Sequence, residues 1–208
     1  EKDKSSYKLE ALGDEKIKGV RKFSFIKPRS RNYIHEWLFH EIAGEGKLIK
    51  LKYEFVILKI NGESQGLYVF EEGFDKDLLE RNRRRNGPIF SIYEEYNENI
   101  FQSKFELYNK NFWNRDENIK LASYARNKLK GFLEQKFNLD ETFDVEKWAF
   151  LFALADLTYT LHGLTPTNVK FYYNPVSGLF EPIPYDGHRF ARNYNAIFGE
   201  YTYGCIWF

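Results

Sequence analysis

Hydrophobic and polar residues recur at regular intervals in the first third of the chain, and their pattern predicts strands around one helix. Imperfect alternation over residues 18–27 indicates a strand. Ser30 is a suitable N-cap, and apolar positions at helical spacing within residues 33–44 predict a helix. Residues 53–60 and 66–70 are β-rich and are joined by a turn with an Asn-Gly pair, which favours a tight hairpin. The expected order is strand, helix, strand, strand.

After residue 70 the pattern becomes mainly helical. Residues 75–85 predict a charged helix, and residues 89–93 predict a short strand. Residues 94–118 are aromatic but aperiodic, so we expect loops and short turns there. Helical spacing returns in residues 121–132 and 145–159, and the second of these helices is apolar almost all round, which is typical of a helix in the middle of a domain.

Two further runs, residues 168–173 and 179–183, predict a β-hairpin near the end of the chain. No internal repeat is visible, and no linker longer than a loop separates the two halves. The sequence therefore predicts an α+β fold with two lobes in one domain. A β-rich N-lobe with one helix would cover residues 1–72, and a mainly helical C-lobe that carries the β-hairpin would cover residues 73–208.

Composition narrows the possible classes of protein. The 208 residues are 43% hydrophobic and 19% aromatic, which is enough to fill a core. A net charge of +1 does not favour nucleic acid as a partner, and no apolar run reaches the roughly 18 residues that span a bilayer. The single cysteine, Cys205, cannot form an internal disulfide. The apolar end at residues 206–208 leads us to expect a fragment of a longer protein, so the compartment stays open.

Several polar residues in the last third of the chain are candidates for chemistry. Asp156 shares a helical stripe with apolar residues, so we expect a buried acid that is either a structural partner of a loop or arginine, or a catalytic base. Asn168 and Asp186 stand at the two ends of the predicted hairpin and can converge on one point, as in phosphoryl-transfer sites that hold Mg²⁺ through oxygen ligands. The alternative is that both serve only as turn residues.

The order of these residues is also that of a protein kinase, where Pro-x-Asn precedes a short hairpin and an aspartate follows it. The first lobe supplies the remaining parts in the expected order. Lys27 ends the first strand, Glu36 lies one turn into the helix, and Glu71 and Glu72 lead into the place where a kinase hinge contacts adenine through its backbone. Lys22 competes with Lys27 for the lysine role, because the two point to opposite faces of the strand.

Several stretches resemble the CotH kinase family, the atypical kinases named for spore coat protein H. The resemblance covers roughly residues 18–189, and it is most specific in the segment from Asn168 to Asp186. The stretches that carry it are Arg29 to Trp37, Val56 to Gly62, Gly66 to Lys76, Asn168 to Pro175 and Glu181 to Asp186.

The resemblance implies a protein-kinase-like fold and transfer of the γ-phosphoryl of ATP to Ser or Thr hydroxyls of a protein substrate, with Mg²⁺ or Mn²⁺. It also implies that Asp186 and Asn168 bind the metal, that Lys27 contacts phosphate, and that Glu36 is its ion-pair partner. A spore coat, cell-surface or secreted location would follow, although a cytoplasmic one is compatible with the sequence.

Three departures from the kinase pattern bear on activity. The position of the usual catalytic aspartate is occupied by Gly163, so the base must come from elsewhere; Asp156 is our first candidate and His162 is its rival. His188 stands where many family members carry a second acid, which bears on metal binding. No glycine-rich loop pattern is present near the start of the chain.

Two alternatives to a protein kinase remain open at this point. A catalytically weak or inactive surface or coat protein would use the same fold as a binding scaffold, and a related enzyme would phosphorylate a small molecule or sugar. The basic run at residues 81–85 is either a solvated helix end or a site that recognises an acidic or phosphorylated substrate.

Overall fold

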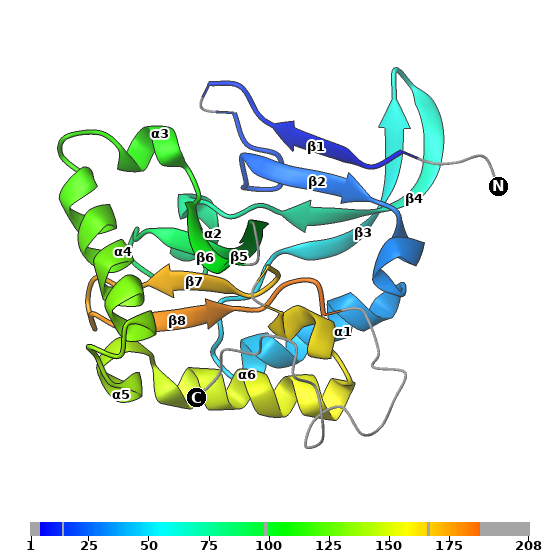
Figure 1. Ribbon diagram of the computed structural model, residues 1–208. Helices are drawn as coiled ribbons and strands as arrows, with labels where there is room; N and C mark the ends of the chain where they lie inside the picture. Colours follow the sequence, from blue (N-terminus) through cyan, green and yellow to red (C-terminus); the bar gives the residue numbers. More distant parts are fainter. Residues whose placement is uncertain (1–4, 14, 98–99, 166, 188–208) are drawn as a thin grey trace.

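The computed structural model describes residues 5–13, 15–97, 100–165 and 167–187 (Figure 1). Within these residues the chain is an α+β protein with two four-stranded antiparallel sheets, so the predicted fold class is confirmed at that level. The first sheet has the strand order β1-β2-β4-β3, and the second has the order β6-β5-β7-β8. The predictions about His188, Cys205 and the apolar end lie outside the described residues.

The first sheet and one helix are formed by the first third of the chain. The 3₁₀ helix η1 connects the second strand to the helix α1, and the last two strands form a hairpin. Asn61 and Gly62 both have positive φ, at 51° and 86°, which is the backbone of a two-residue hairpin turn. The elements are β1 (Tyr7–Glu10), β2 (Lys22–Ile26), η1 (Pro28–Arg31), α1 (Ile34–Glu45), β3 (Tyr53–Ile60) and β4 (Glu63–Glu72).

The second sheet is built from two hairpins that are far apart in the sequence, with most of the helices between them. Its strands are β5 (Ile89–Asn97), β6 (Ile100–Leu107), β7 (Lys170–Tyr173) and β8 (Phe180–Ile183). The helices are α2 (Lys76–Arg81), α3 (Lys110–Trp113), α4 (Ile119–Leu133), α5 (Leu139–Thr142), α6 (Val145–Thr158) and the 3₁₀ helix η2 (Leu161–Leu164).

Where β5 pairs with β7 and β8 follows, the second sheet is buried on both faces, and its side chains alternate between two cores. Phe90 and Phe171 face a large core that includes residues of α4 and α6. Ile89, Tyr172 and Ile183 face a second core formed with the segment before β3 and with α2. Side chains two residues apart on a strand lie on the same face, so this alternation decides which residues of β7 point toward the first sheet.

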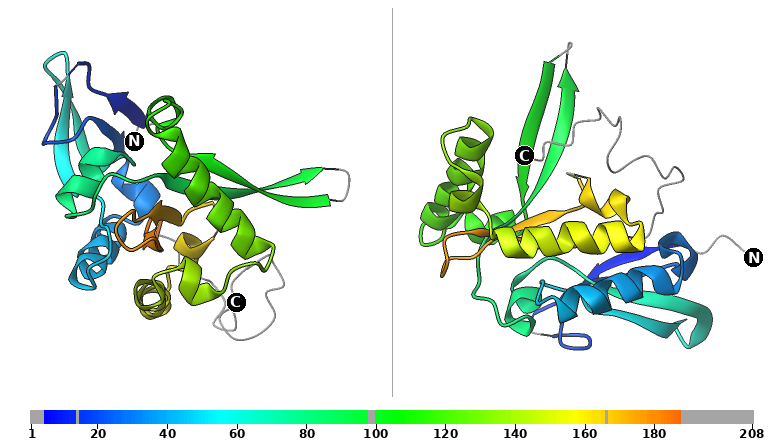
Figure 2. Two further views of the ribbon diagram at one scale, coloured as in Figure 1. Left: turned by 90° about the vertical axis from the view of Figure 1, so that its left-hand side faces the viewer. Right: turned by 90° about the horizontal axis from the view of Figure 1, so that it is seen from below.

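Helix α1 joins the two halves of the molecule. It lies alongside α6 (Figures 1 and 2), and Phe39 and Ala43 from α1 belong to the same core as Leu151 and Leu154 from α6. The hydrophobic core is therefore not divided at residue 72, because helix α1 of the predicted N-lobe shares a core with the second sheet. The division into lobes at residues 72 and 73 stays a prediction.

The prediction of loops and short turns at residues 94–118 is wrong for residues 94–97 and 100–107, and correct for residues 108–118, where turns flank the four-residue helix α3. Strands β5 and β6 form a long hairpin, and only Ile89–Ser91 of β5 pair with β7. The remainder of the hairpin is two-stranded and projects from the body of the protein (Figure 2). An arm without a packed face on the core does not need strict apolar alternation, so its sequence carries a weak strand signal.

Two smaller predictions about the first third of the chain also need correction. Residues 7–10, which the sequence pattern left without an element, form β1 along the edge of β2. Ser30 is not the N-cap of α1: it lies within η1, and Tyr33 occupies the cap position. Both differences arise where four-residue elements are too short to show a periodic pattern.

Candidate functional site

Side chains from all four strands of the first sheet form one row that reaches from a surface pocket to a buried acid. The strand register places Lys8 opposite Ser24, Ser24 opposite Glu71, and Glu71 opposite Tyr53. Directly paired residues share a face of the sheet. We call this set of four residues the upper row.

The second sheet presents a matching row, which we call the lower row. Glu106 pairs with Ser91, Ser91 with Lys170, and Lys170 with Ile183. The two rows meet at both ends. Lys8 and Glu106 line the same pocket, and Arg31 connects Glu71 of the upper row to Tyr185, which follows the lower row in the chain.

Arg31 is the cation at the centre of the buried site. Its guanidinium forms an ion pair with Asp186, approaches Glu71 to 3.4 Å, and donates a hydrogen bond of 3.0 Å to the Tyr185 hydroxyl. The Arg31 and Asp186 side chains are each 13% exposed, and that of Glu71 is 6% exposed. The guanidinium also lies 5.0 Å from the centre of the Tyr185 ring. Three elements are thus joined through one side chain: η1, β4 and the segment after β8.

His162 brings the two ends of the β7–β8 hairpin together. Its Nε2 lies 2.9 Å from Oδ2 of Asp186, and its backbone carbonyl accepts a hydrogen bond of 2.9 Å from Nδ2 of Asn168. Asp186 and Asn168 therefore both contact the same residue of η2. Gly163 lets η2 pack closely against the segment after β8. A Cβ at this residue would lie only 3.2 Å from the Gly187 Cα and from the Tyr185 carbonyl oxygen. A side chain is poorly accommodated at this position.

A second set of buried polar residues lies beneath Glu71. Glu36 and His40, one turn apart on α1, are both buried, with Nε2 of His40 3.2 Å from Oε1 of Glu36. Burial raises the pKa of the Glu71 carboxyl. The positive charge of Arg31 lowers this pKa, and the negative charge of Glu36 raises it further. Burial also raises the pKa of the Tyr53 and Tyr185 hydroxyls.

Aromatic rings connect this buried site to the pocket. The Phe74 ring lies 5.1 Å from that of Tyr185 and 4.9 Å from that of Tyr108, measured between ring centres. Tyr108 lines the pocket, and Tyr185 is adjacent to Asp186. The ammonium of Lys170 lies over both Phe74 and Tyr185, and burial lowers its pKa to about 8.

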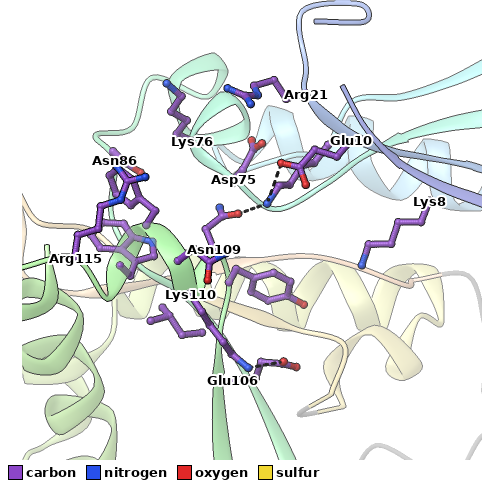
Figure 3. A pocket seen from close by; sticks show the side chains of 16 residues that line it. Lys8, Glu10, Arg21, Asp75, Lys76, Asn86, Glu106, Asn109, Lys110 and Arg115 are labelled. Carbon is purple, nitrogen blue, oxygen red and sulfur yellow. Dashed lines mark hydrogen bonds and ion pairs between the residues drawn. The ribbon is translucent and has the colours of Figure 1, made fainter. Parts of the chain in front are cut away.

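The pocket has a volume of about 740 Å³, which is the size of a cofactor site. Figure 3 shows Lys8 and Glu10 entering it from the first sheet, with Glu106 and Lys110 on the opposite side. Six of its lining residues are basic and three are acidic. The basic residues are Lys8, Arg21, Lys22, Lys76, Lys110 and Arg115, and the acidic residues are Glu10, Asp75 and Glu106.

Four of the six basic side chains in the pocket form no ion pair with a carboxylate of the described residues. Among the described residues, no ion pair joins Lys8, Arg21, Lys76 or Arg115 to a carboxylate; Lys22 is 3.7 Å from Glu10, and Lys110 is 3.2 Å from Glu106. The Lys22 ammonium also donates to the side chain of Asn109. The pocket is therefore suited to an anion.

The structure changes the candidates for the phosphate-contacting lysine. Lys22 and Lys8 line the pocket, whereas Lys27 follows β2 as the N-cap of η1 and is not among the lining residues. Arg31 reaches the buried carboxylates of Glu71 and Asp186. The sequence analysis did not identify Lys8 or Arg31 as residues of the site. The pairing of β1 with β2 would have identified Lys8, since it places Lys8 and Glu10 on one face beside Ser24 and Lys22.

Glu71 and Glu72 are the last residues of β4, and both are buried. Glu72 pairs with Arg81 through its carboxylate and accepts a hydrogen bond of 2.8 Å from the Lys52 amide. The Glu72 amide donates to the Lys52 carbonyl, and the Gly73 amide donates to the Lys22 carbonyl. The backbone donor of Glu72, one of the two residues that the hinge interpretation offered to adenine, is thus already used, as is that of the following Gly73.

The expected burial of Asp156 is wrong. Asp156 is exposed, as are Val145 and Tyr159 of the same stripe, and α6 instead buries Trp148, Leu151, Leu154 and Ala155. Because α6 is apolar almost all round, its sequence does not identify the buried face. Of the two candidate bases, the structure brings His162 to Asp186 and leaves Asp156 on the outer side of α6.

The basic run at residues 81–85 is partly structural. Arg81 pairs with the buried Glu72, and Arg84 pairs with the buried Glu181 at 2.8 Å. Arg84 also donates to the Lys47 carbonyl. Arg81 and Arg84 therefore compensate buried carboxylates of β4 and β8, whereas Arg83 and Arg85 are exposed.

The described residues thus combine a mixed α+β fold, a buried arginine among acids, and a pocket whose lining is more basic than acidic. The chain belongs to the CotH kinase family: the family model described as CotH kinase protein matches residues 1–199. The resemblance seen in the sequence is thereby confirmed, and the protein is kinase-like at the level of its family. No protein with curated annotation matches the chain. None of the helices in the described ranges has the length and apolar character needed to cross a bilayer.

Proposed function

We propose that this member of the CotH kinase family transfers the γ-phosphoryl group of ATP to Ser or Thr hydroxyls of a protein acceptor. The observation that carries the proposal is the basic pocket of about 740 Å³, which the neighbouring rings of Tyr108, Phe74 and Tyr185 connect to the segment that carries Asp186. Lys8 lines the pocket and shares the upper row with Glu71, which Arg31 joins to Asp186. A nucleotide in the pocket would extend its phosphate chain along the two rows toward Asp186.

The residues around Asp186 fit a divalent ion that arrives with a nucleotide. Asp186 offers a carboxylate and Asn168 offers its amide oxygen, and Mg²⁺ is commonly held by one or two protein oxygens together with substrate phosphates and waters. The described residues contain no group of three or more His, Cys, Asp and Glu that could hold a metal alone. When bound, Mg²⁺ or Mn²⁺ neutralises charge on the phosphates. Arg31 would then give up its contact with Asp186.

The other side chains have roles that follow from their positions. Lys8 and Lys22, which extend from the first sheet, would bind phosphate oxygens. They would take the phosphate-contacting role that the sequence analysis assigned to Lys27. Glu36, through His40, and Glu71, through Arg31, would hold the buried side of the site in place. His162 would accept the proton of the attacking hydroxyl, a contribution typically worth about 10²- to 10⁴-fold in rate.

A scaffold function is the second candidate, and one observation favours it. The Asp186 carboxylate is already held by Arg31 and His162, so a protein that never binds metal would keep this ionic cluster as a structural link. A phosphotransferase must exchange Arg31 for the metal during each catalytic cycle. The two functions therefore differ in whether a metal nucleotide stabilises the fold.

Thermal unfolding in the presence of ATP and Mn²⁺ tests the proposal. A ligand at 100 times its dissociation constant stabilises the folded state by about 2.7 kcal/mol, which raises the melting temperature by several degrees. We expect the wild type to show this rise with ATP and Mn²⁺ together, and Asp186→Asn to lose most of it. A wild-type protein that shows no rise at millimolar ATP and Mn²⁺ would support the scaffold function instead.

A further inference from the structure

Lys170 carries a buried ammonium group on the face of β7 that belongs to the lower row. The residue is 4% exposed. Its Nζ donates to the backbone carbonyl of Thr167 and lies 5.7 Å from the centre of the Phe74 ring and 5.2 Å from that of Tyr185. Among the described residues, no carboxylate lies within ion-pair distance of this ammonium.

A buried cation without a counter-charge is unfavourable unless other groups compensate it. Two aromatic faces and one carbonyl oxygen supply part of the compensation, because the face of a ring attracts a cation. An ammonium has three N–H donors, and the contact with Thr167 uses one of them. The remaining charge and donors are suited to an anionic ligand.

The position of Lys170 indicates which part of a ligand it would meet. In the lower row it lies between Glu106, which lines the pocket, and Ile183, which precedes Tyr185 and Asp186 by two and three residues. Its ammonium also lies beside the loop that carries Asn168, since it contacts the Thr167 carbonyl. A chain of phosphates that follows the lower row from the pocket to Asp186 would therefore pass Lys170.

We propose that Lys170 is a phosphate-binding residue that contacts the phosphate chain of the nucleotide between the pocket and Asp186. This inference rests on the proposed function, because it takes the nucleoside triphosphate as the ligand. The ammonium acts as a compact positive charge for phosphate oxygens. The rings of Phe74 and Tyr185 flank the ammonium, so the charge is positioned before the ligand arrives.

A purely structural Lys170, which only bridges Phe74 and Tyr185, is the competing explanation. The two differ in one measurable quantity, the ratio of the affinity for ATP to that for adenosine. A structural lysine contributes to stability, and its loss would change both affinities together. A phosphate-binding lysine contributes to the affinity for ATP alone.

The test is to measure dissociation constants of ATP and adenosine, in Mn²⁺ buffer, for the wild type and for Lys170→Met, which keeps the length of the side chain and removes its charge. We expect the affinity for ATP to fall at least about tenfold, with the affinity for adenosine unchanged, since only ATP would lose a charge-assisted hydrogen bond. Lys170→Arg keeps the charge and should recover part of the loss.

Lys128→Met is the matched control. The Lys128 ammonium is also partly buried and donates to a backbone carbonyl, that of Gly178, but it lies in α4 outside the pocket and both rows. Its ATP affinity should equal that of the wild type. A folded Lys170→Met protein with unchanged ATP affinity overturns the inference and leaves the proposed function standing, whereas a wild type that does not bind ATP overturns both. Should Lys170→Met not fold, Lys170→Gln and Lys170→Arg make the same comparison between a neutral and a charged side chain.

Discussion

The guanidinium of Arg31 joins the carboxylate of Asp186 to that of Glu71, so a single buried cation connects the first sheet to the segment that follows β8. Breaking a buried ion pair leaves an uncompensated charge, which typically costs about 3–5 kcal/mol. Arg31→Met should therefore lower the free energy of unfolding by about 3 kcal/mol in urea denaturation.

Arg29→Met provides the control for this change, because Arg29 is a neighbouring and exposed arginine of η1. Its effect should stay within about 0.5 kcal/mol. The double variant Arg31→Met with Asp186→Asn should lose less than the sum of the two single losses, since one removed charge relieves the other. An Arg31→Met protein as stable as the wild type would contradict the structural role of the cluster.

Neutralising a lysine in the pocket should weaken nucleotide binding. Lys8→Met and Lys22→Met each remove a positive charge that lines the pocket. The ATP dissociation constant, measured by calorimetry with Mn²⁺, should rise about tenfold in each, as expected for one charge-assisted hydrogen bond.

Lys27→Met is the comparison that decides between the two lysine assignments. Lys27 does not line the pocket, so its replacement should leave ATP affinity within about twofold of the wild type. The opposite result, with Lys27 sensitive and Lys8 and Lys22 insensitive, would return the phosphate-contacting role to Lys27 and move the nucleotide out of this pocket.

The two candidate bases should respond differently to substitution. His162→Asn should lower kcat for phosphoryl transfer by about 10²-fold or more, because it removes the group that would accept the hydroxyl proton. Asp156→Asn should leave kcat unchanged, since the carboxylate is exposed on α6. A large loss in Asp156→Asn with little loss in His162→Asn would overturn the assignment of His162.

Asp75 should make stability depend on pH. Burial, with the neighbouring charge of Asp77, raises the pKa of Asp75 from 3.8 to about 6 in the folded protein. Between pH 4 and 6 the folded state therefore binds more protons at this group than the unfolded state does. Protonation of Asp75 therefore increases the free energy of unfolding at pH 4, and this stabilisation is lost as the pH rises to about 6.

Asp75→Asn removes this titration and keeps an N-cap for α2, because asparagine accepts hydrogen bonds from the same backbone amides. Urea denaturation at several pH values should show a flatter dependence for Asp75→Asn between pH 4 and 6, and higher stability than the wild type at pH 7. The exposed Asp140→Asn, in the first turn of α5, is the control and should keep the wild-type slope. Equal slopes for Asp75→Asn and the wild type would refute the prediction.

The sequence predicts the elements of this fold best where periodicity is long and one-sided. The hairpin of β3 and β4, helix α4 and helix α6 all lie close to their predicted ranges. The β5–β6 arm was missed because most of it does not pack on a third strand, and β1 was missed because four residues are too few for a pattern.

The site divides in a similar way. Asn168 and Asp186 were expected to meet because a hairpin brings its ends together, and the structure connects both to His162. The places of Arg31 and Lys8 in the site depend on contacts between elements that are far apart in the chain. No local sequence pattern predicts such contacts. The exposure of Asp156 could not be read from α6, because a helix that is apolar on every side does not indicate which side is buried.

The most direct test of the central claim is the incorporation of labelled γ-phosphate from ATP into protein by the wild type and by Asp186→Asn, with and without Mn²⁺. We predict metal-dependent transfer by the wild type and a loss of several orders of magnitude in Asp186→Asn, because this carboxylate would hold the ion that neutralises the transferring group. Equal labelling by the two folded proteins, or none by a wild type that binds ATP, would contradict the account.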